Sequence, residues 1–266
     1  MNTNLFHLAG SAEDRSAAVQ SFIMHHMVDG HEWTVWPGLH VPLPPFLTLH
    51  GAMAILAARV LLLLFGVLYR RQDAVPSGLT NALELFVEFI RDKICIPYLG
   101  EDDGRRMTPV FCSFFFFILT MNMLGLVPCF ASATANVSVT GALACVSFGF
   151  MVFGAMYRHG VAGFFKGFIP EGVPWPILII LLPVELIGVF IKSFALCIRL
   201  FANMLAGHIV IFSLLGLVLM FGWVALPSVA MALGIYLMEV FIAFLQAFIF
   251  TLLSAVFIGQ RYHPAH

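Results

Sequence analysis

The chain has 266 residues, of which 61% are hydrophobic and only 10% are charged, and its net charge is -1. Soluble domains carry about 25% charged residues, so this composition indicates a multi-spanning membrane protein. The near-neutral charge excludes a basic nucleic acid-binding surface. No nucleotide-binding or zinc-protease motif occurs, and the cysteines are scattered singly, so we expect no cofactor and no metal site.

Residues 1–45 are expected to form an N-terminal segment outside the membrane, and residues 46–266 a single membrane domain. The first segment mixes polar and apolar residues and lacks a basic stretch followed by an apolar core, so we predict no cleaved signal peptide. The His25-His26 pair within it is interpreted as exposed and solvated rather than as a metal site.

The first apolar stretch runs from about Phe46 to Tyr69 and ends at Arg70-Arg71, which is typical of a spanning helix with a basic stop. Arg59 lies inside this span. Two explanations for it stay open at this point: snorkelling to the interface, and pairing with a neighbouring helix.

The next segments alternate between surface and membrane. Residues 79–98 place apolar side chains at helical spacing opposite charged ones, which predicts an amphipathic surface helix. The charged residues 101–106 are expected to form a solvated loop. Further spans are predicted at about 108–130 and from 138 to about 157, followed by a loop over 158–176 that is rich in glycine and proline.

Two long apolar runs, about 177–220 and 225–258, complete five predicted spans and an all-α fold. A helix of about 32 residues is about 48 Å long, whereas the hydrocarbon core is about 30 Å thick. Such a helix would need a tilt near 50°, beyond the usual range of about 0–40°. We therefore expect residues 177–258 either to break or to form a steeply tilted hairpin.

The positive-inside rule predicts the orientation of these five spans in the membrane. The basic residues outside the spans, Arg15 excepted, fall on one side: Arg70, Arg71, Arg91, Lys93, Arg105, Arg106, Arg158, Lys166 and Arg261. The N-terminus is therefore predicted outside and the C-terminus in the cytoplasm.

A polar stripe runs along the first of the two long helices. Glu185, Lys192 and Arg199 are seven residues apart each time, so they lie on one face, which Asn203 extends. A charge at the bilayer centre costs about 2.5–3.5 kcal/mol on insertion scales. Charges placed on one face at this cost suggest a polar or charged partner on that side. The alternative explanation is an internal Glu185–Lys192 ion pair with snorkelling of the basic side chains. Arg199 argues against it, because apolar sequence flanks it on both sides.

The second long helix carries Glu239 and Gln246, again seven residues apart. In an antiparallel hairpin centred near Trp223, His208 lies opposite Glu239 and Arg199 opposite Gln246. One register thus brings both polar pairs together, and a His–Glu pair is suited to a proton relay. However, His208 and Arg199 are nine residues apart, on opposite sides of a straight helix, so this register requires a bend or a π-bulge.

The sequence RLFANMLAGH at residues 199–208 resembles the signature of subunit a of F-type ATP synthases. The resemblance extends to PSGLTNALELFVEFI, FILTMNMLGLVP and LQAFIFTLLSAVF and covers most of the chain. It implies a position beside a ring of c subunits that carry membrane-embedded carboxylates. It also implies the b subunits of a peripheral stalk and other ATP synthase subunits as partners.

The resemblance further implies a mechanism. A proton enters through one aqueous half-channel, neutralises a ring carboxylate, travels with the rotating ring and leaves through a second, offset half-channel. Arg199 corresponds to the family's arginine, which attracts the deprotonated carboxylate and prevents a direct leak; arginine is suited to this because it stays charged. The residues that the match assigns to the proton path are Glu185, Lys192, Asn203, His208, Glu239 and Gln246.

Within that assignment, Glu185 belongs near the cytoplasmic exit, and the residues near the outer entry are Asn203, His208, Glu239 and Gln246. Many bacterial members have glutamate at the position of His208 and histidine at that of Glu239, so this chain keeps the acid–imidazole pair with its partners exchanged. The resemblance implies a non-catalytic subunit of the bacterial cytoplasmic membrane, with the mitochondrial inner membrane as the alternative.

Other function classes stay open on the residues alone. A secondary transporter would carry paired repeats or broken helices in two halves, which the sequence does not display. A structural scaffold would not need so many ionisable residues within its spans. A sodium-coupled rotary complex remains an alternative, since the ion site of the ring is not in this chain.

Overall fold

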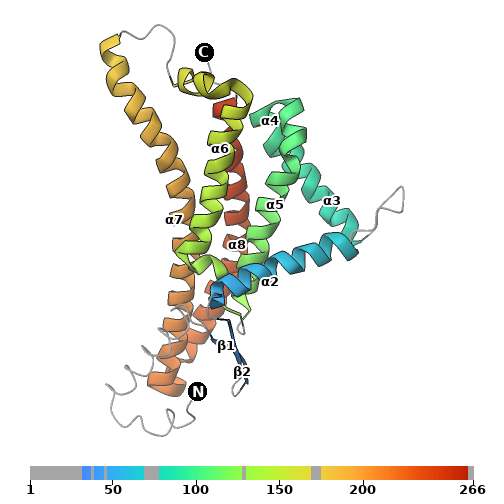
Figure 1. Cartoon of the computed structure of the whole chain (residues 1–266). Coiled ribbons are helices and arrows are strands. Elements are labelled where there is room, and N and C mark those ends of the chain that lie inside the picture. The colour runs from blue at the N-terminus through green and yellow to red at the C-terminus, as the bar shows by residue number, and fades with distance from the viewer. Residues whose placement is uncertain are drawn as a thin grey trace. The chain divides into compact units, whose positions relative to one another are not determined.

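The computed structural model describes residues 32–36, 39–44, 47–68, 78–127, 130–168 and 175–262, and most of them are helical (Figure 1). Labels with η denote short π- or 3-10-helical turns. The elements in chain order are β1 (Glu32–Trp36), β2 (Leu39–Pro42), α2 (Leu49–Leu63), η2 (Leu64–Leu68), α3 (Leu79–Ile90), η3 (Arg91–Cys95), α4 (Ile96–Leu99), α5 (Glu101–Leu126), η4 (Ala133–Ala135), α6 (Val137–Lys166), α7 (Trp175–Phe221), η5 (Gly222–Ala225) and α8 (Leu226–Tyr262).

The described helices confirm the prediction of five spans. Those long and apolar enough to cross a membrane are Leu49–Gly66, Glu101–Leu126, Val137–Phe165, Pro176–Val218 and Leu226–Tyr262. The structure adds a small antiparallel β hairpin, β1–β2, that the sequence analysis did not predict. This hairpin lies in the expected N-terminal segment, whereas the His25-His26 pair and Arg15 lie outside the described residues.

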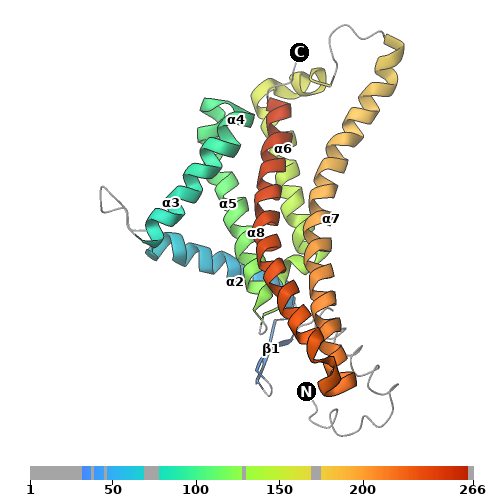
Figure 2. The same cartoon turned by 180° about the vertical axis from the view of Figure 1, so that it is seen from behind.

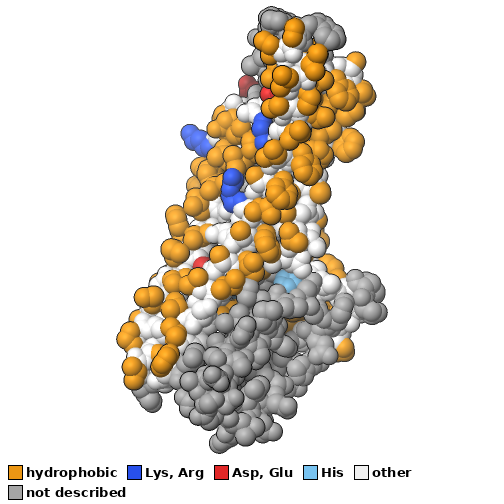
Figure 3. Space-filling view, turned by 90° about the vertical axis from the view of Figure 1, so that its left-hand side faces the viewer, with side chains coloured by type: hydrophobic (Ala, Val, Ile, Leu, Met, Phe, Trp, Pro, Cys, Tyr) orange, Lys and Arg blue, Asp and Glu red, His pale blue; other side chains and the backbone are white. Residues whose placement is uncertain are grey.

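Hydrophobic side chains cover much of the described surface on the face that Figure 3 shows. On α7, large apolar residues such as Ile180, Phe190 and Phe194 are more than half exposed. Soluble monomers rarely expose apolar surface on this scale. The exposed side chains are therefore suited to contact with lipid or with other membrane chains.

The chain forms two compact units, which we call unit 1 and unit 2 and describe separately. Unit 1 comprises Met1–Arg59, Leu119–Val139 and Leu200–Leu245. Unit 2 comprises Val60–Ile118, Thr140–Arg199 and Gln246–His266. Each of the helices α5 to α8 contributes residues to both units.

The predicted surface helix is present in unit 2, as the continuous run α3–η3–α4. It ends at Gly100, whose φ of 82° lies in the left-handed region that favours glycine. The loop predicted at residues 101–106 is wrong, because α5 begins directly at Glu101. Three acidic residues occupy the first turn of α5, where their charge stabilises the positive end of the helix dipole.

The loop predicted over 158–176 is also wrong in its first part. The helix α6 continues to Lys166, with a break at Gly160, which has a φ of 72°. Glycine adopts this conformation at no steric cost. The helical pattern therefore resumes after one residue instead of ending there.

The two long runs form helices of 47 residues (α7) and 37 residues (α8), and α7 continues through Pro183. Within unit 1 they join through the short turn η5, close to the predicted centre at Trp223 (Figure 2). The hydroxyl of Ser228 donates to the carbonyl oxygen of Leu214 at 3.1 Å, which ties the two helices together near the turn. The steep tilt of this hairpin stays a prediction.

Candidate functional site

In unit 1, Glu239 of α8 packs directly against Gly207 of α7. A Cβ atom at Gly207 would overlap the carboxylate of Glu239, so any larger residue there requires the carboxylate to move. Glu239 is 5% exposed, and neither of its carboxylate oxygens has a hydrogen-bond partner among the described residues. A buried carboxylate without a partner is costly, which is typical of a group that exchanges protons.

His208, the next residue on α7, has two hydrogen-bond contacts of its own. Its Nδ1 lies 2.8 Å from the carbonyl oxygen of Met204, and its Nε2 lies 3.0 Å from that of Gly125 on α5. Carbonyl oxygens only accept, so both contacts are hydrogen bonds only when both ring nitrogens carry a proton. The imidazole interacts electrostatically with Glu239, without a hydrogen bond between them.

Asn122 forms the centre of a buried polar network that holds α5 and α8 together within unit 1. Its amide donates to the carbonyl oxygen of Ala243 on α8 at 3.3 Å, and its Oδ1 accepts from the hydroxyl of Thr134 at 2.8 Å. Both Asn122 and Thr134 are fully buried. The sequence analysis assigned no role to Asn122; the signal was an amide in an otherwise apolar span.

In unit 2, two charged residues of α7 bind the end of α8. The guanidinium of Arg261 donates to Oε2 of Glu185 at 2.8 Å. Lys192 donates to Oε1 of Gln260 at 2.9 Å. The last apolar run was predicted to end at about residue 258, and neither Gln260 nor Arg261 was predicted as a partner of the polar stripe. The alternative Glu185–Lys192 ion pair is not formed.

Arg199 differs from the other charged residues of α7. Its side chain is exposed near the middle of the helix. It makes no hydrogen bond or ion pair with any described residue, and this includes Gln246, the neighbour expected from the hairpin register. Gln246 is buried on α8, and Asn203 is partly buried on α7. Arg199 therefore has no acidic partner among the described residues, and an arginine within a membrane helix generally pairs with another group or faces water.

The described residues hold no cluster of three or more His, Cys, Asp or Glu side chains that could bind a metal ion. Their polar groups instead form pairs between helices. These pairs have the chemistry of proton transfer and ion pairing.

Comparisons with known proteins identify relatives of the whole membrane part. A family model described as ATP synthase A chain matches residues 51–259. A relative from Chloroherpeton thalassium, named ATP synthase subunit a, is 46% identical over 253 residues, covering 89% of this chain and 75% of that protein. A relative from Prosthecochloris aestuarii, named ATP synthase subunit a 2, is 40% identical over 275 residues, covering 97% of this chain and 84% of that protein.

A relative from Anaeromyxobacter sp. strain Fw109-5, named ATP synthase subunit a, is 46% identical over 218 residues, or 80% of this chain. This chain spans about half the length of that relative, 53%. The family match covers each of the side chains described in this section except Gln260 and Arg261. The family match covers most of this chain, and the relatives named here are 40–46% identical to it over 80–97% of its length. This chain therefore belongs to the ATP synthase A chain family.

Proposed function

We propose that the chain is the proton-conducting, non-catalytic stator subunit of a rotary F-type ATP synthase. Its partners are a ring of c subunits, the b subunits of a peripheral stalk and the other ATP synthase subunits. Two offset half-channels lead to the carboxylates of the ring, and Arg199 separates them. Proton flow through the two half-channels drives rotation of the ring and thereby ATP synthesis.

The observation that carries this proposal is the isolated guanidinium of Arg199. Glu185 and Lys192 each have a partner on α8, whereas Arg199 is exposed and has none among the described residues. A membrane-embedded carboxylate on a neighbouring chain supplies the missing countercharge. Because arginine does not release its proton, it attracts this carboxylate without relaying a proton past it.

The neighbourhood of His208 and Glu239 supports the entry path. The imidazole has two carbonyl acceptors and can hold one proton or two, while the buried carboxylate beside it has no competing hydrogen bond. Proton transfer to Glu239 would require the imidazole to turn away from one of its carbonyl acceptors and toward the carboxylate. Asn203 and Gln246 provide polar atoms on the same two helices.

Reconstitution tests the proposal directly. Liposomes that contain the membrane complex with the c ring should take up protons under an imposed membrane potential, as measured with an enclosed pH-sensitive dye. Liposomes with the same complex lacking the ring should not. A proton flux of equal size without the ring would contradict the proposal and favour a secondary transporter. Sodium uptake in place of proton uptake would favour the sodium-coupled alternative.

The proposed orientation in the bacterial cytoplasmic membrane follows from the distribution of basic residues. A cysteine introduced near Arg15 should react with an impermeant maleimide only from the outside of cells, and one near Arg261 only in inverted vesicles. Five spans place the two ends on opposite sides. Labelling of both cysteines from the same side would contradict this topology.

A further inference from the structure

Near the C-terminal end of α8, the largely buried guanidinium of Arg261 pairs with the exposed carboxylate of Glu185. The side chain of Arg261 is 11% exposed, whereas that of its partner Glu185 is 46% exposed. The guanidinium carbon of Arg261 lies 4.2 Å from the ring centroid of Phe168, which follows α6. Stacking on an aromatic ring fixes the plane of a guanidinium. The cation is therefore held in place, while the carboxylate keeps a face free for other groups.

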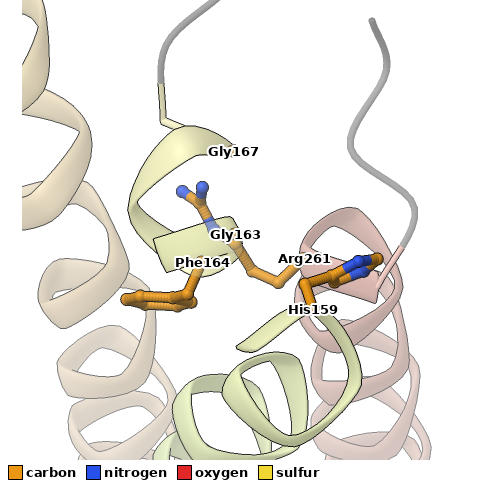
Figure 4. Close-up of a pocket in the computed structure, with 5 residues that line it drawn as sticks. All are labelled: His159, Gly163, Phe164, Gly167 and Arg261. Atoms are coloured by element: carbon orange, nitrogen blue, oxygen red, sulfur yellow. The ribbon is translucent and has the colours of Figure 1, made fainter. Parts of the chain in front are cut away.

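The surroundings of Arg261 restrict it further. A small pocket at the end of α6 is lined by Arg261, His159, Gly163, Phe164 and Gly167. Figure 4 shows the side chain of Arg261 extending from α8 toward the turn with Gly163 and Gly167, while His159 points away from it. Gly163 and Gly167 leave room for the guanidinium on this side of the pocket. Neither carries a polar side chain that would compete with Glu185 for it.

The other described charged groups near this pair already have partners. Lys192 donates to Gln260 and lies 5.3 Å above the ring of Phe257. On α6, Nε2 of His159 donates to the carbonyl oxygen of Tyr262 at 2.9 Å. Arg158 forms an ion pair with Asp103 of α5 and lies against the Tyr262 ring. The acid that pairs with Arg261 in the described part of the chain is thus Glu185.

We propose that Arg261 is a positioning residue for proton release at Glu185, an inference that rests on the proposed function. A proton that reaches Glu185 binds the carboxylate and frees it from Arg261. It then passes from the carboxyl oxygen to water, and the restored carboxylate returns to the guanidinium. The guanidinium cannot accept this proton in its place. Arg261 therefore favours the released state and returns the acid to a fixed position after each transfer.

The test uses membrane vesicles that contain the whole complex. Arg261→Gln should lower ATP synthesis driven by a proton gradient about fivefold, a typical size for coupling within one ion pair, because protons leave through Glu185 in this direction. Arg261→Lys keeps the charge and should recover most of the ATP synthesis. In a Glu185→Gln background, the change Arg261→Gln should cause no further loss, because the acid that it positions is already absent.

A second measurement does not depend on the rate of ATP synthesis. An ion-paired carboxylate is shielded from carbodiimides, so Glu185 should react several times faster in the Arg261→Gln complex than in the wild type, as quantified by mass spectrometry. Arg105→Gln is the matched control, since Arg105 forms an exposed pair with Glu101 in the same unit and such pairs contribute little. It should change neither readout.

The two hypotheses fail in different ways. ATP synthesis at the wild-type rate and unchanged carbodiimide labelling in Arg261→Gln would overturn the role of Arg261. So would losses that simply add in the double variant. Either result leaves the proposed function intact as long as Arg199→Ala blocks pumping. Pumping at the wild-type rate in Arg199→Ala would instead remove the proposed function itself.

Discussion

Replacing Arg199 with alanine is expected to stop ATP synthesis driven by a proton gradient in membrane vesicles. The exposed guanidinium has no partner among the described residues, so its removal leaves the fold of this chain unstrained. Under the proposed function, what is lost is the charge that attracts the ring carboxylate. Truncating one member of a buried charge pair costs about 2–5 kcal/mol, so the rate should fall by about 30-fold or more.

Arg199→Lys separates the effect of the charge at residue 199 from that of the side-chain geometry, and Arg105→Ala is the control. Arg199→Lys keeps the charge, but an ammonium lacks the planar fork of a guanidinium and can lose its proton, so most of the activity should still be lost. Arg105→Ala, which removes an exposed arginine elsewhere, should leave ATP synthesis unchanged. Synthesis at the wild-type rate in the Arg199→Ala complex, with assembly verified on native gels, would refute the proposed role.

A single methyl group at Gly207 is expected to lower proton pumping about 10- to 100-fold. The new Cβ atom would overlap the carboxylate of Glu239, which is buried and must move to make room. Displacing a reacting group by about 1 Å can cost about 100-fold in rate. The measurement is ATP-driven quenching of a pH-sensitive dye in inverted vesicles, together with the amount of assembled complex.

Gly188 provides the matched control on the same helix. A Cβ atom there would meet nothing within 4 Å, and alanine is about 1 kcal/mol better than glycine in a helix. Gly188→Ala should therefore assemble and pump normally. Combining Gly207→Ala with Glu239→Asp shortens the acid by one methylene and should restore part of the loss. Normal pumping by Gly207→Ala alone would show that the position of Glu239 is not critical.

Those properties that depend on hydropathy and helical periodicity could be predicted from the sequence. The five spans, the surface helix and the turn of the long hairpin all occur where the apolar runs and the amphipathic pattern indicated. The contact of Gly207 with Glu239 also lies within one residue of the predicted register. Seven-residue spacing is informative here because it keeps polar groups on one face over many turns.

Other features depend on local backbone chemistry or on contacts between distant segments. The charges of residues 101–106 predicted a loop, yet acidic residues at a helix start are stabilising, and Gly100 had already ended the preceding helix. A loop was predicted from residue 158, but α6 continues to Lys166 and Gly160 only interrupts it. The pair Glu185–Arg261 joins residues 76 positions apart, and no local pattern marks such a contact.

The buried amide of Asn122 has a mechanical consequence for the proposed stator. In that role, a rotor turning against the hairpin would push α8 sideways, and a helix held only by apolar contacts would slide or rotate under the force. The bond from Asn122 to the backbone of Ala243 resists both movements, because its donor and acceptor must stay aligned. In the proposed complex, torque on α8 would thereby pass to α5, and the proposed entry-path residues would keep their positions as the ring moved past them.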